Sequence, residues 1–349
     1  MHNEIYMQRC LDLAIRGIGM VSPNPMVGCV IVHNNEIIGE GWHEMYGSAH
    51  AEVNAINAVL NRFGENAASI LKESTIYVSL EPCAHFGKTP PCADLIIKHQ
   101  LKKVYVGCRD PFPAVAGKGI ERILENGIEV EVGIKENACL ELNKRFFTRV
   151  LKQRPYIILK WAQTKNGFYA PLDRSQNWIS GKAAKNLVHK WRAEEDAILI
   201  GKNTALIDNP SLTTRNWTGK NPIRVVVDRN LDIPKHYNLY NNEAQTIILN
   251  ANKTDISNNI RFISIEDMDY YLPQKILYQL HLLDIQSVII EGGSQLLNTF
   301  INEGLWDEAR VFTSPKNWEN GLFAPIIKQK PLENINVGKD ILSIYKNTK

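Results

Sequence analysis

Hydrophobic residues recur at helical spacing near the start of the chain and then give way to short apolar runs. The first predicted helix has one apolar stripe, formed by Met7, Leu11, Ala14, Ile15 and Ile18. Residues three and four apart share a helix face, and Gly17 and Gly19 are expected to end this helix. The run Val27–Val32 predicts a buried strand, and the polar turn His33–Glu36 before Ile37-Ile38 predicts a hairpin.

Strands and helices then alternate through the rest of the first half, which is typical of an α/β layered sheet. The predicted strands are Thr75–Leu80, Val104–Cys108 and Ile128–Val132, and the predicted helices are Ala51–Leu60, Cys92–His99, Lys118–Glu125 and Glu136–Phe147.

The pattern restarts after a charged segment, Arg145–Arg154, that meets Pro155. We therefore predict two domains, residues 1–147 and 148–349, which suits a chain of 349 residues. Hairpin-like apolar runs near Asp307–Thr313 predict that the second α/β domain has a mixed rather than a purely parallel sheet. Its other predicted strands are Tyr156–Lys160, Ala197–Ile200, Ile223–Val227, Thr246–Leu249 and Ser287–Ile290, and its helices are Gly181–Arg192, Gln274–Leu283 and Gln295–Asn302.

Composition narrows the class of protein. A net charge of +3 is far from the basic balance of a nucleic-acid groove. The six cysteines show no secreted disulfide framework. The first residues have no signal-peptide pattern, and no apolar run approaches the ~20 residues of a membrane span. We therefore expect a cytoplasmic protein that binds neither nucleic acid nor membrane.

The stretch from His50 to Cys92 contains the candidate chemistry. His50, Cys83 and Cys92 offer one imidazole and two thiols, which are three ligands for a tetrahedral zinc with a fourth position left for water. Glu52 is the expected proton shuttle between that water and a leaving nitrogen. This set of residues matches the zinc-deaminase signature, H-x-E followed by P-C and a second Cys.

Two helix starts are expected to bring these residues together. Residues two apart do not share a helix face, so His50 and Glu52 can meet one site only from the first turn of a helix. Cys92 likewise precedes an apolar helical run. The partial positive charge of both helix N-termini would favour thiolate and hydroxide.

Two other readings of these residues stay open. Cysteines in an intracellular protein are often buried and behave as small hydrophobic residues. A structural zinc is the stronger competitor, because it normally has four protein ligands and His85 could supply the fourth.

Five motifs together resemble one family, the bifunctional riboflavin-biosynthesis deaminase–reductases. They are Pro23–Gly28, His50–Glu52, Glu81–Cys83, Gly87–Cys92 and Asp110–Gly119. The long loop between Cys83 and Cys92 separates this family from deaminases with the short C-x-x-C spacing. The resemblance implies a three-layer cytidine-deaminase-like fold in the first domain. It also implies that Asn24 contacts the pyrimidine substrate.

The second domain has no G-x-G-x-x-G, so a Rossmann reading has no support. Glu291-Gly292-Gly293-Ser294 lies between a strand and a helix, where backbone N–H groups can approach a phosphate. Arg192 and Arg215 could hold a substrate phosphate bidentately. Taken alone, the glycines can be an ordinary turn and each arginine an ordinary surface residue.

The resemblance implies a dihydrofolate-reductase-like second domain that uses NADPH. It assigns nucleotide contacts to Ala162, Trp178, Thr204, Asp208, Gly293 and Ser294. It assigns substrate contacts to Lys160, Gln176, Arg192, Leu212, Arg215 and Glu291. The chain departs from the family's pattern at two places: Thr164-Lys165-Asn166-Gly167 stands where S-L-D-G is usual, and Ser314–Gly321 matches the family's last stretch poorly.

We therefore expect zinc-dependent hydrolysis of the 2-amino group of 2,5-diamino-6-ribosylamino-4(3H)-pyrimidinone 5′-phosphate. NADPH-dependent reduction of the ribosyl group to ribityl follows, and a homo-oligomer is expected. The alternatives are a single-function deaminase whose second domain only binds substrate, and a zinc-stabilised binding module. Nucleic-acid editing is a third alternative, and affinity that falls steeply with salt would favour it.

Overall fold

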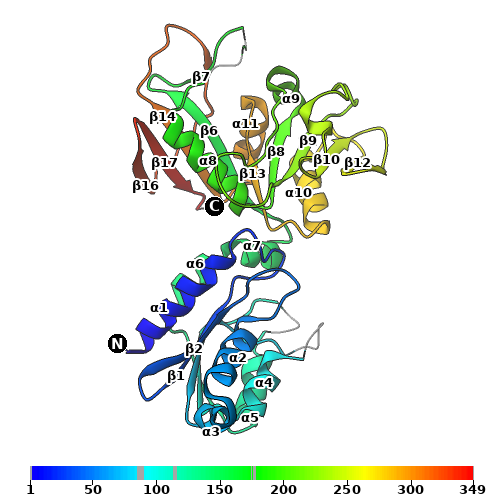
Figure 1. The fold of residues 1–349 in the computed structure, drawn as a ribbon. Coiled ribbons are helices and arrows are strands. Elements are labelled where there is room, and N and C mark those ends of the chain that lie inside the picture. The colour runs from blue at the N-terminus through cyan, green and yellow to red at the C-terminus, as the bar shows by residue number, and fades with distance from the viewer. Residues whose placement is uncertain (1, 85–89, 113–115, 174, 176–177, 349) are drawn as a thin grey trace. The chain divides into compact units, whose positions relative to one another are not determined.

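The structure is a computed structural model that describes residues 2–84, 90–112, 116–173, 175 and 178–348. The chain divides into two compact units, residues 1–153 and residues 154–349. Figure 1 shows that each unit is a β-sheet with helices packed on it.

The first unit is built on a five-stranded sheet of order β2-β1-β3-β4-β5. β1 pairs antiparallel with both β2 and β3, whereas β3, β4 and β5 run parallel. The strands are β1 Gly28–His33, β2 Glu36–Trp42, β3 Thr75–Leu80, β4 Lys103–Cys108 and β5 Glu129–Val132.

Helices cover both faces of this sheet, which makes three layers. One face packs against α2, α4 and α5 through a core that includes Ile56, Ile96 and Ile123. The other face packs against α1 and α6 through a core that includes Met7 and Cys139. The helices are α1 His2–Ala14, α2 Ala51–Phe63, α3 Ala67–Lys72, α4 Cys92–Lys98, α5 Lys118–Glu125, α6 Glu136–Leu142 and α7 Lys144–Lys152, with short 3-10 turns at Ile15–Gly17 and Gly64–Asn66.

Glycines in β2 let α2 lie very close to the sheet. A Cβ on Gly41 would stand 2.4 Å from the Ala51 carbonyl oxygen, so no larger residue fits there without movement. Asn54 Nδ2 donates to the Trp42 carbonyl at 2.8 Å and ties the same turn of α2 to the end of β2. The start of α2, where His50 and Glu52 lie, is therefore fixed against the sheet.

The helix predicted over Glu136–Phe147 is two helices, so that prediction was wrong in detail. Asn143 separates α6 from α7. Its side chain accepts from Met26 N and donates to Met26 O, both at 2.8 Å. A buried amide that pairs with a distant backbone breaks a helix that the apolar spacing would continue. The first helix likewise ends at Ala14, earlier than the apolar stripe suggests.

The second unit is built on a mixed ten-stranded sheet of order β11-β12-β10-β9-β8-β13-β6-β14-β17-β16. Its central strands run parallel, and β11, β16 and β17 run antiparallel to their neighbours. The strands are β6 Tyr156–Thr164, β8 Ala197–Gly201, β9 Ile223–Val227, β10 Thr246–Asn250, β11 Asp255–Ser257, β12 Ile260–Ser264, β13 Ser287–Ile290, β14 Glu308–Ser314, β16 Glu333–Val337 and β17 Asp340–Lys346. A separate two-stranded sheet pairs β7 Phe168–Ala170 with β15 Leu322–Phe323.

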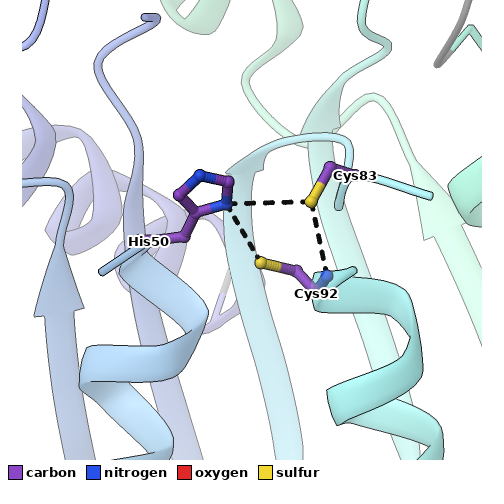
Figure 2. Close-up of side chains that lie close together, drawn as sticks. All are labelled: His50, Cys83 and Cys92. Atoms are coloured by element: carbon purple, nitrogen blue, oxygen red, sulfur yellow. Dashed lines mark hydrogen bonds between the residues drawn. The ribbon is translucent and has the colours of Figure 1, made fainter. Parts of the chain in front are cut away.

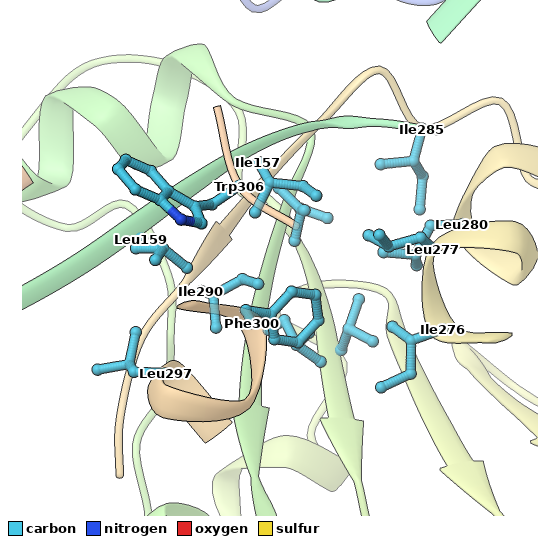
Figure 3. Close-up of a cluster of buried hydrophobic side chains, with 14 of the residues drawn as sticks. Ile157, Leu159, Ile276, Leu277, Leu280, Ile285, Ile290, Leu297, Phe300 and Trp306 are labelled. Carbon is cyan, nitrogen blue, oxygen red and sulfur yellow. The ribbon is translucent and has the colours of Figure 1, made fainter. Parts of the chain in front are cut away.

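The second sheet also has helices on both faces. Figure 3 shows α10 and α11 packing Ile276, Leu280, Leu297 and Phe300 against Ile157, Leu159 and Ile290. The opposite face packs against α8 and α9. The helices are α8 Lys182–Glu194, α9 Lys202–Asp208, α10 Leu272–Leu282 and α11 Ser294–Asn302, with a 3-10 turn at Asn238–Tyr240.

The strands and helices predicted from apolar runs are present at about the expected positions. The mixed sheet is confirmed as well, although β14 pairs with β6 and β17 and is not an arm of a local hairpin. The sequence reading missed α3, α9, β7, β11, β12 and β15–β17. In the described part of the chain, no helix is both long and apolar enough to cross a membrane.

Candidate active sites

The first unit brings His50, Cys83 and Cys92 together from three places in the chain (Figure 2). His50 is the residue before α2, and Cys92 is the first residue of α4. Cys83 lies after β3 and accepts the backbone N–H of Cys92 on its sulfur at 3.3 Å. The sequence prediction that two helix starts meet at this point is confirmed.

The three ligand atoms have the spacing that a tetrahedral ion requires. His50 Nδ1 lies 3.3 Å from Cys92 Sγ and 3.7 Å from Cys83 Sγ. Zinc bonds of ~2.0–2.1 Å to nitrogen and ~2.3 Å to sulfur, at the tetrahedral angle, place nitrogen and sulfur about 3.6 Å apart. All three ligand atoms lie within 4.8 Å of one another. The residues therefore fit zinc, with Nδ1 as the histidine ligand.

The environment favours a thiolate at this cluster. Hydrogen bonding from Cys92 lowers the pKa of the Cys83 thiol, and His50 acts in the same direction. The pKa of Cys92 is raised because it shares its proton with Cys83 and is buried. Hydrogen bonding to Cys83 raises the pKa of His50. Metal ligands must be deprotonated, and Cys83 is the sulfur that this arrangement deprotonates first.

Glu52 lies in the first turn of α2, almost completely buried at 3% exposure. Burial raises its pKa to about 7, with the Cys83 thiolate as the next cause. A carboxyl group that titrates near neutral pH can both accept and return a proton under physiological conditions. Glu52 does not belong to the ligand cluster, so its carboxyl group is available for proton transfer.

Asn24 lies against a buried histidine that the sequence reading did not single out. His43 Nδ1 faces the Ala49 carbonyl at 3.1 Å, so Nδ1 carries the proton and Nε2 is an acceptor. The Asn24 amide nitrogen then donates to Nε2 at 3.1 Å. Burial lowers the pKa of His43, which keeps it neutral in this role. The pairing fixes which end of the Asn24 amide faces His43.

Glu81 is a second residue whose role the sequence reading missed, although it belongs to a quoted motif. Its buried carboxylate accepts four backbone N–H groups. Oε2 accepts from Asp110 and Gly117 at 3.2 and 3.1 Å, and Oε1 accepts from Gly119 and Ile120 at 3.1 and 3.4 Å. Glu81 therefore fixes the start of α5 beside the segment that contains Cys83.

Helix α5 contains no zinc ligand but contacts both cysteine segments. A Cβ on Gly119 would stand 1.9 Å from the Pro82 carbonyl oxygen, so α5 lies directly on the backbone before Cys83. Arg122 pairs with Asp94 of α4 at 2.7 Å and donates to the Ala84 carbonyl at 3.4 Å. The position of each cysteine therefore depends on α5. His85, the possible fourth ligand, lies outside the described residues.

In the second unit, three predicted substrate residues form one half-buried charge cluster. Glu291 follows β13, and its Oε2 accepts from Arg192 at 3.2 Å while Oε1 lies 3.8 Å from Lys160 Nζ. Burial opposes the charge on Glu291, but Lys160 and Arg192 outweigh it and hold its pKa below the usual range. Burial lowers the pKa of Lys160 more than Glu291 raises it.

Two atoms of this cluster are buried without a hydrogen bond from the described residues. They are Glu291 Oε1 and Arg192 Nε. Buried polar groups in native proteins are normally paired. An acceptor and a donor in one charge cluster, both without a hydrogen bond from the described residues, are suited to a polyhydroxylated or phosphorylated ligand.

Arg192 and Arg215 have different environments. Arg192 also donates to the Thr213 carbonyl at 3.3 Å, so two of its nitrogens are already engaged. Arg215 is exposed, and its backbone N–H donates to Nδ1 of buried His189 at 3.1 Å. Leu212 is buried with φ +54°. Such a conformation is strained for leucine and is often found at functional sites.

The predicted nucleotide residues meet at the turn after β13. Gly293 N donates to Thr204 Oγ1 at 2.9 Å, and a Cβ on Gly292 would stand 2.6 Å from the same oxygen. Ser294 starts α11, and its Oγ accepts from the Tyr169 hydroxyl at 3.1 Å. Thr204 and Ser294 therefore flank one glycine turn at a helix N-terminus, where anions bind.

The remaining predicted residues are more scattered. Trp178 is 58% exposed, and Lys185 Nζ lies above its ring. Ala162 lies in β6. Asp208 is the last residue of α9, and burial raises its pKa. Gln176 lies outside the described residues.

Of the residues that the sequence prediction missed, His189 had a signal, because it lies three positions before Arg192 on the same helix. Tyr169 had none.

Both halves of the chain match known protein families. Residues 1–108 match the cytidine and deoxycytidylate deaminase zinc-binding region, and residues 155–318 match the RibD C-terminal domain. The riboflavin biosynthesis protein RibD of Aquifex aeolicus is 38% identical over 356 residues, which cover 98% of this chain and 97% of that protein.

Two solved structures share the whole fold. One is a diaminohydroxyphosphoribosylaminopyrimidine deaminase/5-amino-6-(5-phosphoribosylamino)uracil reductase from Thermotoga maritima. It has a TM-score of 0.90 at 34% identity and covers 99% of both chains. The other is Acinetobacter baumannii RibD, with a TM-score of 0.88 at 33% identity, covering 100% of this chain and 99% of that one.

Proposed function

Because this chain belongs to the RibD family of riboflavin biosynthesis, we propose how its residues divide the family's two reactions. The protein is a bifunctional enzyme that deaminates and then reduces a pyrimidine intermediate of this pathway. The first domain would remove the 2-amino group of 2,5-diamino-6-ribosylamino-4(3H)-pyrimidinone 5′-phosphate. The second would reduce the ribosyl group of the resulting 5-amino-6-(5-phosphoribosylamino)uracil to ribityl.

For deamination, we propose that His50, Cys83 and Cys92 hold zinc. The ion would lower the pKa of the water that attacks the ring carbon. Glu52 would take the proton from that water and return it to the leaving nitrogen. Asn24, oriented by His43, contacts the pyrimidine ring.

For reduction, we propose that Lys160, Arg192 and Glu291 contact the ribosyl group and its phosphate, and that Gln176 and Leu212 complete the substrate site. The two atoms of the charge cluster that have no hydrogen bond from the described residues support this assignment. Arg215 is exposed and keeps its guanidinium for the phosphate.

We propose NADPH as the hydride donor of this reaction. Its phosphates would lie at the turn formed by Thr204, Gly293 and Ser294, at the positive end of the α11 dipole. Ala162, Trp178 and Asp208 would contact the rest of the nucleotide. Steady-state kinetics with NADPH and NADH test the choice, and equal or better use of NADH would refute it.

We also propose a cytoplasmic location and a homo-oligomer. A reducing compartment keeps Cys83 and Cys92 available as thiolates. The edge strand β16 offers an unpaired sheet edge for association. Light scattering of the purified protein would give its assembly state, and a monomer at all concentrations would contradict the second proposal.

The spacing of His50 Nδ1 from the two cysteine sulfurs carries the deaminase assignment. The test is a product analysis with the diaminopyrimidinone substrate. Without NADPH, the deaminated uracil should accumulate with about one zinc per chain, as the three-ligand site requires. With NADPH, the ribityl product should replace it. Full deaminase activity in protein stripped of metal would refute the zinc mechanism.

A further inference from the structure

The two stretches that depart from the family's sequence pattern lie against each other in the structure. They are the turn Thr164–Gly167 and the segment Ser314–Gly321. The backbone N–H of Lys165 donates to the Lys316 carbonyl at 2.8 Å. These stretches are far apart in the sequence and meet because β6 and β14 pair as far as Thr164 and Ser314.

The contact is centred on the side-chain amide of Asn166. Its Nδ2 donates to the Trp318 carbonyl at 2.7 Å, and its Oδ1 accepts from the Trp318 N–H at 3.2 Å. Oδ1 also accepts from Thr164 Oγ1 at 2.8 Å, and Thr164 Oγ1 accepts from Phe168 N at 2.9 Å. One amide therefore satisfies both backbone groups of Trp318 and orders its own turn.

An aspartate, which the sequence resemblance gives as the family's usual residue at this position, cannot make the same contact. A carboxylate only accepts hydrogen bonds. It could keep the Trp318 N–H and the Thr164 hydroxyl, but its second oxygen would face the Trp318 carbonyl oxygen. Because Asn166 is exposed, water can take the place of the lost donor at the Trp318 carbonyl, so the cost is that of about one hydrogen bond.

The same two stretches lead directly to the proposed nucleotide site. The turn continues into β7, where Tyr169 donates to Ser294 Oγ at 3.1 Å and accepts from Ser294 N at 3.4 Å. The segment continues into β15, which pairs with β7. Lys316 Nζ donates to the Trp178 carbonyl at 2.8 Å.

We propose that Asn166 is a positioning residue for the nicotinamide nucleotide of the reductase. Through Trp318 it fixes β7 and β15, and through Tyr169 it sets the Ser294 turn on which the nucleotide phosphates would lie. The role requires an amide and not an acid, which accounts for the residue that this chain has in place of the family's aspartate. The inference rests on the proposed cofactor site.

The test replaces Asn166 with the family residue, Asn166→Asp, in the full-length zinc-loaded protein. Asn317→Asp is the matched control. It makes the same chemical change one residue from Trp318, at an exposed side chain that has no hydrogen bond within the described chain. The loss of one hydrogen bond predicts about a three- to tenfold rise in the Kd and KM for NADPH. The kcat and the pyrimidine KM should change less than twofold, and Asn317→Asp should match the wild type.

Tyr169→Phe provides a second, independent readout. It removes only the hydroxyl that reaches Ser294, so it should raise the Kd for NADPH without an added charge. If both residues act through one path, Asn166→Asp with Tyr169→Phe should weaken NADPH binding less than the product of the two single effects.

The outcomes separate this inference from the proposed function. Wild-type protein that binds neither NADPH nor NADH would refute the cofactor assignment and the inference with it. Wild-type binding of NADPH with equal Kd values for Asn166→Asp and Asn317→Asp would refute the inference alone. A fall in melting temperature with an unchanged Kd for NADPH would also refute it, since Asn166 would then be only structural.

Discussion

Glu81→Gln tests whether a residue that touches no ligand atom maintains the zinc site. The substitution keeps the shape of a side chain that is 4% exposed. It replaces one carboxylate oxygen by an NH2 group. Each oxygen accepts two backbone N–H groups, so two donors lose their acceptor whichever oxygen is replaced.

The expected cost follows from those two lost bonds. Hydrogen bonds to a charged group contribute about 1.5–3 kcal/mol each, so the free energy of unfolding of the first domain should fall by about 3–6 kcal/mol. With a urea dependence of about 2–3 kcal/mol per M, the unfolding midpoint should fall by about 1–3 M.

The assay follows zinc release into a chromogenic chelator during urea unfolding of the full-length protein. Reductase activity in the same samples reports on the second domain, whose core is separate. Glu121→Gln is the control, because Glu121 is an exposed carboxylate in the first turn of α5. Its midpoint should move by no more than the equivalent of about 0.5 kcal/mol. If Glu81→Gln releases zinc at the same urea concentration as Glu121→Gln, the role assigned to Glu81 is wrong.

Three further predictions concern the two active sites. Glu52→Gln should lower deamination about 10²- to 10⁴-fold while zinc content and reduction of already deaminated substrate stay near normal. Loss of both activities together with a lower melting temperature would instead mean a structural role. Arg215→Lys should raise the reductase KM for the pyrimidine and leave NADPH affinity nearly unchanged, because Lys is a poorer bidentate partner for phosphate; a change in NADPH affinity alone would place Arg215 at the cofactor. Burial, followed by Arg192 and Arg215, lowers the pKa of His189 to about 4. As pH falls from about 6.5 to 4, the unfolded chain therefore takes up a proton that the folded protein refuses, and stability falls. His189→Asn, which keeps an acceptor for Arg215 N, should weaken this pH dependence in urea unfolding, and an unchanged slope would contradict it.

The local sequence pattern was sufficient to predict the elements of the zinc site, because the candidate ligands lie next to apolar residues at helical spacing. The apolar spacing after His50 predicts α2, and the position of His50 at its start follows from the loop before it. Cys92 was placed at the start of α4 by the same reasoning. These predictions succeed because a helix terminus and its first turn are determined by neighbouring residues.

Contacts between distant segments could not be predicted in this way. The break at Asn143 depends on its amide pairing with Met26, and the role of Glu81 depends on amides of a later loop. The strand β14 was placed by its apolar run, but its partners were not, because parallel pairing with β6 leaves no local trace. Tyr169 became visible only because β7 lies beside α11.

The order of strands along the second sheet has a consequence for synthesis on the ribosome. Residues 156–164, which form β6, pair with residues 287–290 and 308–314 and with no earlier strand. The five strands of the first sheet are all complete by Val132. Domains generally fold as they emerge, and pairings between distant segments form slowly. The deaminase domain can therefore fold and bind its metal before the strands that pair with β6 have been translated. Until most of its residues have been translated, the nascent reductase domain exposes β6 as an unpaired central strand.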